Sequence, residues 1–239
     1  ALGSSVKGEN GEGGITMTYF YGLMTALWLC CVSFSANGQE SSNLQWHGYF
    51  SQGITQSIDS DFITSDNQIS AELTEIGLNG LYQVASNISI AGQVVYLDGG
   101  NRFEQGSRLD YLFIDWTVDD IAGWQAQIHL GRYKNSHWLY SVTRDVPQTR
   151  DTAVLPQSVY FDGFRDVALG SNGIQTRFSK YTDNHVWEVN WSYGRSTINE
   201  EQRDYLLGSL ALGEIKQDFV HQFSVFWQPA SMNWKLGAS

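Results

Sequence analysis

The links between strand-like segments alternate between long and short from residue 44 to the end of the chain, and this rhythm constrains the fold most. Long links cover 58–70, 99–107, 135–167 and 196–218, and tight turns separate them. An antiparallel meander with this rhythm has its long loops at one end and its turns at the other. The expected strands are 44–57, 71–84, 88–98, 108–119, 124–134, 168–180, 185–195, 219–228 and the start of a ninth at 233.

Apolar and polar residues alternate within these segments, which is typical of strands rather than helices. In 185–194, for example, tryptophan, valine and tyrosine alternate with glutamate, asparagine, serine and glycine. The polar positions hold groups that a dry core would have to pair. These residues are Glu75, Asn79, Gln83, Asp115, Gln125, Gln127, Arg177, Glu188 and Asn190.

Two architectures fit such alternation, a soluble β-sandwich and a transmembrane β-barrel. The expected strands are longer than those of most globular sheets. Tryptophan and tyrosine recur at strand ends, as in an interfacial aromatic girdle, and no helical span follows residue 38. The sequence therefore favours an all-β fold, an antiparallel transmembrane β-barrel with an apolar outside and a wet inside.

The strand count bears on closure, because single-chain bacterial barrels have an even number of antiparallel strands. Eight strands and the start of a ninth indicate the amino-terminal part of a barrel of about sixteen strands. Counting 200–213 as a further strand gives the alternative, a closed ten-stranded barrel.

Residues 19–34 form a continuous apolar run after Met17, and small residues stand at Ala36 and Gly38. This pattern predicts a signal peptide at 17–38, cleaved before Gln39, and hence export. A transmembrane anchor is the alternative, but the run is short for a span of about twenty residues. We expect residues 1–16 to be an unstructured leader and 39–239 to be the barrel domain. The only cysteines, Cys30 and Cys31, would leave with the signal, so the mature chain would have no thiol chemistry.

The formal net charge of −11 argues against a nucleic-acid partner. The five histidines show no metal-ligand spacing, and no glycine loop suited to a phosphate lies between a strand and a helix. We therefore expect neither a metal nor a cofactor.

The longest link, 135–167, carries the motifs that point to a family. They are Gly131-Arg132-Tyr133-Lys134 before it, then Leu139-Tyr140, Thr143-Arg144-Asp145-Val146-Pro147 and Leu155-Pro156-Gln157-Ser158-Val159-Tyr160. With this strand order and loop placement, residues 44–239 resemble the porins of Gram-negative outer membranes. The resemblance implies a third loop that folds into the barrel and narrows a pore for passive diffusion. It also implies contact with outer-membrane lipid, small hydrophilic solutes and ions as cargo, and a homotrimer.

Charge at the narrowest point and pore diameter set the selectivity of a channel. Separate rows of arginine and aspartate in the loop would create a transverse field, whereas pairs would pin the loop down. The residues expected to line the constriction or lumen are Arg132, Lys134, Arg144, Asp145, Arg150, Asp151, Arg177, Asp115 and Glu188.

Two other functions remain open at this point. An outer-membrane acyl hydrolase needs a nucleophile with a base, and Ser136-His137 supplies the residue types. A small closed barrel with a structural or adhesive role would suit the ten-stranded alternative. We expect a channel without catalytic residues.

Overall fold

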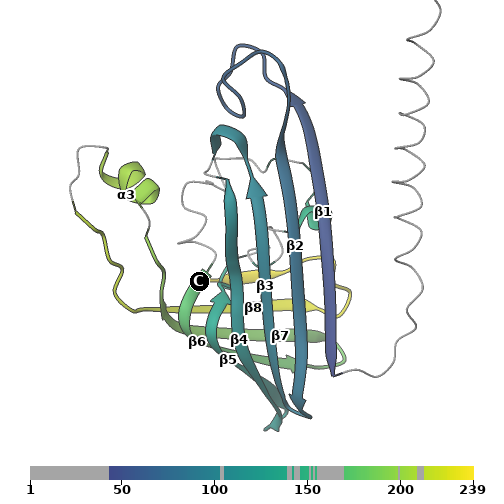
Figure 1. Ribbon diagram of the computed structural model, residues 1–239. Coiled ribbons are helices and arrows are strands. Elements are labelled where there is room, and N and C mark those ends of the chain that lie inside the picture. The colour runs from purple at the N-terminus through teal and green to yellow at the C-terminus, as the bar shows by residue number, and fades with distance from the viewer. Residues whose placement is uncertain are drawn as a thin grey trace, which may run out of the picture. The chain divides into compact units, whose positions relative to one another are not determined.

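The computed structural model describes residues 43–102, 105–138, 142, 146–150, 152, 154, 170–198, 200–208 and 213–239, all within the unit Asn43–Ser239 (Figure 1). The fold is all-β with almost no helix. The strands are β1 (Leu44–Gln56), β2 (Ile69–Ala85), β3 (Ile88–Asp98), β4 (Gly106–Ile121), β5 (Trp124–Lys134), β6 (Gly170–Tyr181), β7 (His185–Arg195), β8 (Val220–Pro229) and β9 (Leu236–Ala238). The helical elements are η1 (Gly100–Arg102), η2 (Pro147–Thr149) and α3 (Glu200–Leu207).

The strands form one nine-stranded sheet in sequence order, and every neighbouring pair is antiparallel. The predicted antiparallel meander is therefore confirmed. Both ends of the first eight strands lie within two residues of the expected positions, whereas the last strand begins at Leu236 rather than at 233. The sheet is open, with β1 and β9 as its edges among the described strands.

The alternative strand at 200–213 is wrong, because Glu200–Leu207 is the helix α3. This segment contains no β-branched residue and is rich in glutamate, glutamine, arginine and leucine, which favour helix. The closed ten-stranded alternative loses its tenth strand with this correction.

The two ends of the sheet differ in the length of their connections. At one end, which we name the turn end, the links are 86–87, 122–123, 182–184 and 230–235. The opposite end, named the loop end, carries 57–68, 99–105, 135–169 and 196–219. Ala122 and Gly123 both have positive φ, as a two-residue hairpin turn requires.

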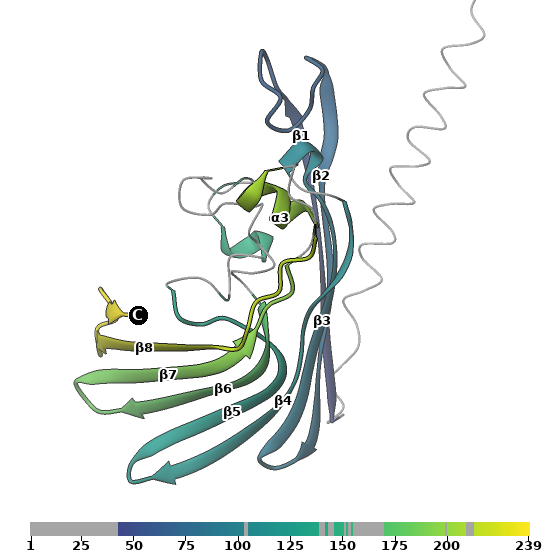
Figure 2. The same ribbon diagram turned by 90° about the vertical axis from the view of Figure 1, so that its left-hand side faces the viewer.

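The sheet has two chemically different faces. One face, named the apolar face, exposes large side chains such as Leu78, Leu112 and Phe223, each about half accessible. The opposite one, named the polar face, buries Gln175, Asn190 and Ser224. The sheet is strongly curved, and η2 lies on its concave side (Figure 2). Burial is therefore inverted relative to an ordinary soluble sheet, in which the apolar side is covered.

Close packing on the polar face depends on glycines opposite aromatic rings. The phenol of Tyr133 covers Gly194, and near the β1 edge of the sheet the ring of Tyr49 covers Gly77. An aromatic side chain laid over a glycine compensates for the side chain that the glycine lacks. Gly131, at the same level as Gly194, has φ +132°, and a Cβ there would collide with the carbonyl oxygen of Leu112.

We predict that Gly131→Ala lowers the free energy of unfolding by about 1–3 kcal/mol, since it combines a strained φ with a backbone clash. Equilibrium unfolding in urea measures the effect. The matched control is Gly106→Ala, where nothing lies within 4 Å of the added Cβ, and we expect less than about 1 kcal/mol. Equal changes in the two variants would contradict the clash.

Candidate functional site

Cross-strand register aligns polar side chains in rows over the polar face. Directly opposite residues of an antiparallel pair point to the same side, so a row of partners shares one face. The first row is Gln83, Ser89, Asp115, His129, Gln175, Ser192 and Gln222. The second row is Thr117, Gln127, Arg177, Asn190 and Ser224.

The first row is connected by direct contacts. His129 Nε2 lies 3.2 Å from Asp115 Oδ1, and His129 Nδ1 lies 3.2 Å from Gln175 Oε1. The ring of Phe113 stacks on the His129 imidazole with 4.3 Å between centroids. The imidazole is thus held between a carboxylate and an amide, which fixes its plane against the wall of the sheet.

Residues of the second row contact the accessible charged side chains of the polar face. Arg177 Nε donates to Asn190 Oδ1 at 3.2 Å, and Asn190 Nδ2 donates to Glu188 Oε1 at 2.9 Å. The Glu188 carboxylate also lies 3.8 Å from Arg177 Nε and 3.6 Å from Lys235 Nζ. These three charged side chains keep between 24% and 31% of their surface accessible. One carboxylate between two cations therefore faces the space above the sheet.

The start of the loop after β5 is fixed to β6, β7 and β8 by hydrogen bonds. His137 Nε2 lies 2.8 Å from Ser192 Oγ, and His137 Nδ1 lies 3.1 Å from Ser224 Oγ. Gln175 Nε2 donates to Ser136 Oγ at 3.0 Å. Burial lowers the pKa of His137, so that this imidazole is neutral near pH 7. We name this set of contacts the histidine anchor.

Through Arg150 the same loop also contacts β2, a strand far from β7 and β8 in the sheet. Its Nη2 lies 2.6 Å from Glu75 Oε1 of β2, 75 positions away in the sequence. The two side chains are only 10% and 14% accessible, so this is a largely buried ion pair. A cleft of about 200 Å³ beside it is lined by Ser51, Leu73 and Pro147, among others. Two described parts of the loop, 135–138 and 146–150, therefore contact strands that lie far apart in the sheet.

The structure places the residues predicted to line a pore in different surroundings. Asp115, Arg177 and Glu188 lie on the polar face, in or beside the two rows. Arg150 lies against β2, paired with Glu75. Arg144, Asp145 and Asp151 fall outside the described residues.

Arg132 and Lys134 stand apart from this group. In β5 Arg132 alternates with His129 and shares the side of Leu130, which is the apolar face. The Lys134 ammonium is buried and lies 2.6 Å from Asp110 Oδ2. The alternation of β5 thus separates Arg132 from the polar rows, whereas the Lys134 ammonium lies over the ring of Tyr111, which is opposite Gln93 on the polar face.

The sequence analysis did not single out the residues that hold the loop. Strand alternation groups Ser192 with Asn190, but nothing in the sequence indicates that His137 would reach Ser192 and Ser224. For the hydrolase alternative, Ser136 accepts from Gln175 while His137 contacts two other hydroxyls. The two side chains of the Ser136-His137 motif therefore serve different partners.

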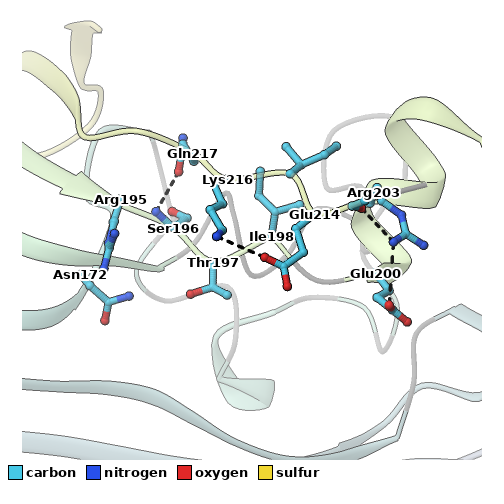
Figure 3. A pocket seen from close by; sticks show the side chains of 12 residues that line it. Asn172, Arg195, Ser196, Thr197, Ile198, Glu200, Arg203, Glu214, Lys216 and Gln217 are labelled. Carbon is cyan, nitrogen blue, oxygen red and sulfur yellow. Dashed lines mark hydrogen bonds and ion pairs between the residues drawn. The ribbon is translucent and has the colours of Figure 1, made fainter. Parts of the chain in front are cut away.

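A second cavity, of about 600 Å³, lies at the loop end between β7, α3 and the segment before β8 (Figure 3). Arg203 Nη2 lies 2.9 Å from Asp204 Oδ1 there, and the exposed Lys216 Nζ lies 3.2 Å from Glu214 Oε2. The side chains of Asn172 and Arg195 lie next to each other at one end of the cavity.

No family model, curated protein or solved structure matches this chain. Among the described residues, no helix has the length and apolar content needed to cross a membrane. In the same part of the chain, no three acidic, histidine or cysteine residues gather as a metal site.

We predict that Arg150→Gln lowers the free energy of unfolding by about 3 kcal/mol, because it leaves the buried Glu75 carboxylate unpaired. The double variant with Glu75→Gln should recover most of this loss, since no charge then remains buried. Lys216→Gln, in an exposed pair, serves as the control and should cost less than about 1 kcal/mol. Additive single effects in a urea double-mutant cycle would contradict the ion pair.

A second prediction concerns acid and the histidine anchor. Because the folded pKa of His137 is lowered, the unfolded chain binds its proton first as pH falls below about 6.5. The stability held at neutral pH is therefore lost progressively below that value. His137→Gln should remove this part of the pH dependence, measured as the difference between two urea-unfolding profiles from pH 8 to pH 5. Parallel profiles for both proteins would contradict it.

Proposed function

We propose that this chain forms the wall of an outer-membrane porin, a water-filled channel through which small hydrophilic solutes and ions diffuse passively. In this proposal the sheet belongs to a closed barrel that crosses the membrane. The loop 135–167 forms the constriction, the signal at 17–38 directs export, and no catalytic step is involved. The observation that carries the proposal is the inversion of the two faces: an exposed apolar face and a covered polar one.

The exposed apolar face supports lipid as its surroundings. Large apolar residues of β2 and β4 on this face remain 45–51% accessible, namely Ile76, Leu78, Leu112 and Ile114. Exposed apolar surface costs about 25 cal/mol per Å² in water, and a continuous patch of this kind marks an interaction surface. Hydrocarbon chains remove that cost without requiring a second protein layer.

Aromatic clusters at both ends of β7 and β8 fit the same interpretation. At the turn end the rings of Trp187, Trp227 and Trp234 form a chain with centroids 6.5 and 4.7 Å apart. Toward the loop end Tyr193 stacks on Phe219 at 5.0 Å. The six residue steps from Trp187 to Tyr193 span about 20 Å of strand. This separation suits an apolar band of roughly 25 Å between two girdles.

The loop contacts support a constriction. The histidine anchor holds the start of the loop on β7 and β8, and Arg150 holds a later part on β2. A segment fixed at two distant points across a concave wall narrows the space in front of that wall. The accessible charges beside it, Arg177, Glu188 and Lys235, would then act on passing ions.

One observation favours a second candidate, a closed barrel with a structural or adhesive role. Asn190, Ser192 and Ser224 are at most 1% accessible, so part of the polar face is filled by protein rather than by water. Conductance separates the two functions, because a plugged barrel carries no current.

We predict that the full-length protein produces discrete ion steps in a planar lipid bilayer. Glu188→Gln should shift the reversal potential in a salt gradient toward anions, because it leaves Arg177 and Lys235 without their shared carboxylate. Lys180→Gln is the control, since Lys180 lies on the apolar face over the Trp124 ring and should leave selectivity unchanged. A bilayer without steps would overturn the channel and favour the plugged barrel.

A further inference from the structure

Two arginines lie in one row on the apolar face, near its loop end. Arg132 of β5 is opposite Asn172 of β6, and Asn172 is opposite Arg195 of β7. Residues in such a row point to the same side of the sheet. With strands about 4.8 Å apart, the two arginine backbones are separated by about 10 Å with an amide between them.

The contacts of the two guanidinium groups show where they lie. Arg195 stacks on the ring of Phe219, 5.5 Å from its centroid, and Phe219 in turn stacks on Tyr193. Both aromatic rings are exposed on the apolar face. The Arg132 guanidinium lies beside Gly170, where a Cβ would approach its Nη2 to 3.4 Å.

The row itself carries two positive charges, and the cavity beside it is lined by Arg203 and Lys216 together with Glu200 and Glu214. Within the described part of the chain, neither Arg132 nor Arg195 forms an ion pair with a carboxylate. Arg132 Nε donates to the backbone oxygen of Asp110 at 3.3 Å, but the Asp110 side chain is already paired with Lys134 at 2.6 Å. In the cavity beside Arg195, the Glu214 carboxylate is paired with Lys216. Two cations and an amide therefore remain to bind an anion from outside the chain.

The cavity of about 600 Å³ beside Asn172 and Arg195 provides space for such a group (Figure 3). Arginine binds phosphate through two parallel hydrogen bonds, and an amide can add a third donor. The row also lies where an aromatic cluster marks the end of the apolar band, the level at which lipid headgroups lie.

We propose that Arg132, Asn172 and Arg195 bind the phosphate of an anionic lipid headgroup in the leaflet at the loop end of the sheet. This inference rests on the proposed membrane-spanning function, in which long loops face outward. The headgroup phosphate supplies the negative charge that the described residues do not provide at this row. The acyl chains of the same lipid then lie along the apolar face below it.

The test uses the full-length protein in phosphatidylcholine nanodiscs that contain lipid A, a phosphorylated lipid. Native mass spectrometry counts the lipid A molecules retained by the wild type, by R132Q/R195Q and by K180Q. Each arginine near a charged headgroup contributes about fivefold in affinity, so the double variant should retain lipid A roughly 25-fold more weakly. K180Q removes a cation from the apolar face at the turn end and should behave like the wild type.

Equal retention by all three proteins would overturn the inference. Displacement of lipid A by inorganic phosphate alone would also overturn it, because the row would then bind a free anion. If R132Q/R195Q does not fold, R195Q alone should show the fivefold loss, since Arg195 is exposed. Conductance in pure phosphatidylcholine bilayers keeps the two proposals separate. If the wild type produces ion steps but retains no more lipid A than R132Q/R195Q, the lipid site alone is rejected. If the wild type enters no bilayer, both proposals are rejected.

Discussion

The two-residue period of a β-strand is the constraint on which the rest of this structure depends. Each strand must present every second side chain to the opposite face, so a sheet divides its residues between two environments. Here Leu112 and Phe223 are exposed, whereas Asn190 and Ser224 are covered. Among the described residues the buried apolar side chains are few, and the packed cluster consists of Val95 and Leu97 with Tyr49 against it. Stability in this sheet therefore relies on the continuous backbone ladder and on satisfied polar contacts more than on an apolar core.

The loop after β5 follows from this constraint, because a covered polar face needs a cover that offers hydrogen bonds. The histidine anchor provides two ring nitrogens to two serine hydroxyls, and Arg150 provides a charge to Glu75. These contacts join β2 to β7 and β8, which are not neighbours in the ladder. The described parts of the loop thus contact the sheet at two separated places, and in the proposed channel the same contacts set the width of the passage.

Periodicity and turn chemistry were sufficient to predict the strands, because both act between residues that are close in the sequence. Alternation also placed Asp115, Arg177 and Glu188 on the polar face. It failed at 200–213, where helix-favouring residues in Glu200–Leu207 outweighed a weak strand pattern. Arg132 was assigned to the lumen because it precedes the loop, although the alternation of β5 places it on the face opposite to that of His129. The Arg150–Glu75 contact joins positions too far apart for any local pattern to reveal.

Charge is arranged differently on the two faces, and the difference argues for a partner outside the chain. On the polar face Asp115 faces His129, Glu75 faces Arg150, and Glu188 lies between Arg177 and Lys235. On the apolar face Arg132 and Arg195 share a row without a carboxylate among the described residues, although the chain has an excess of acidic residues. Placing cations beside hydrocarbon is unfavourable unless an anion meets them there. In the proposed membrane setting, a lipid phosphate at the edge of the apolar band would supply that anion at the level where the two arginines lie.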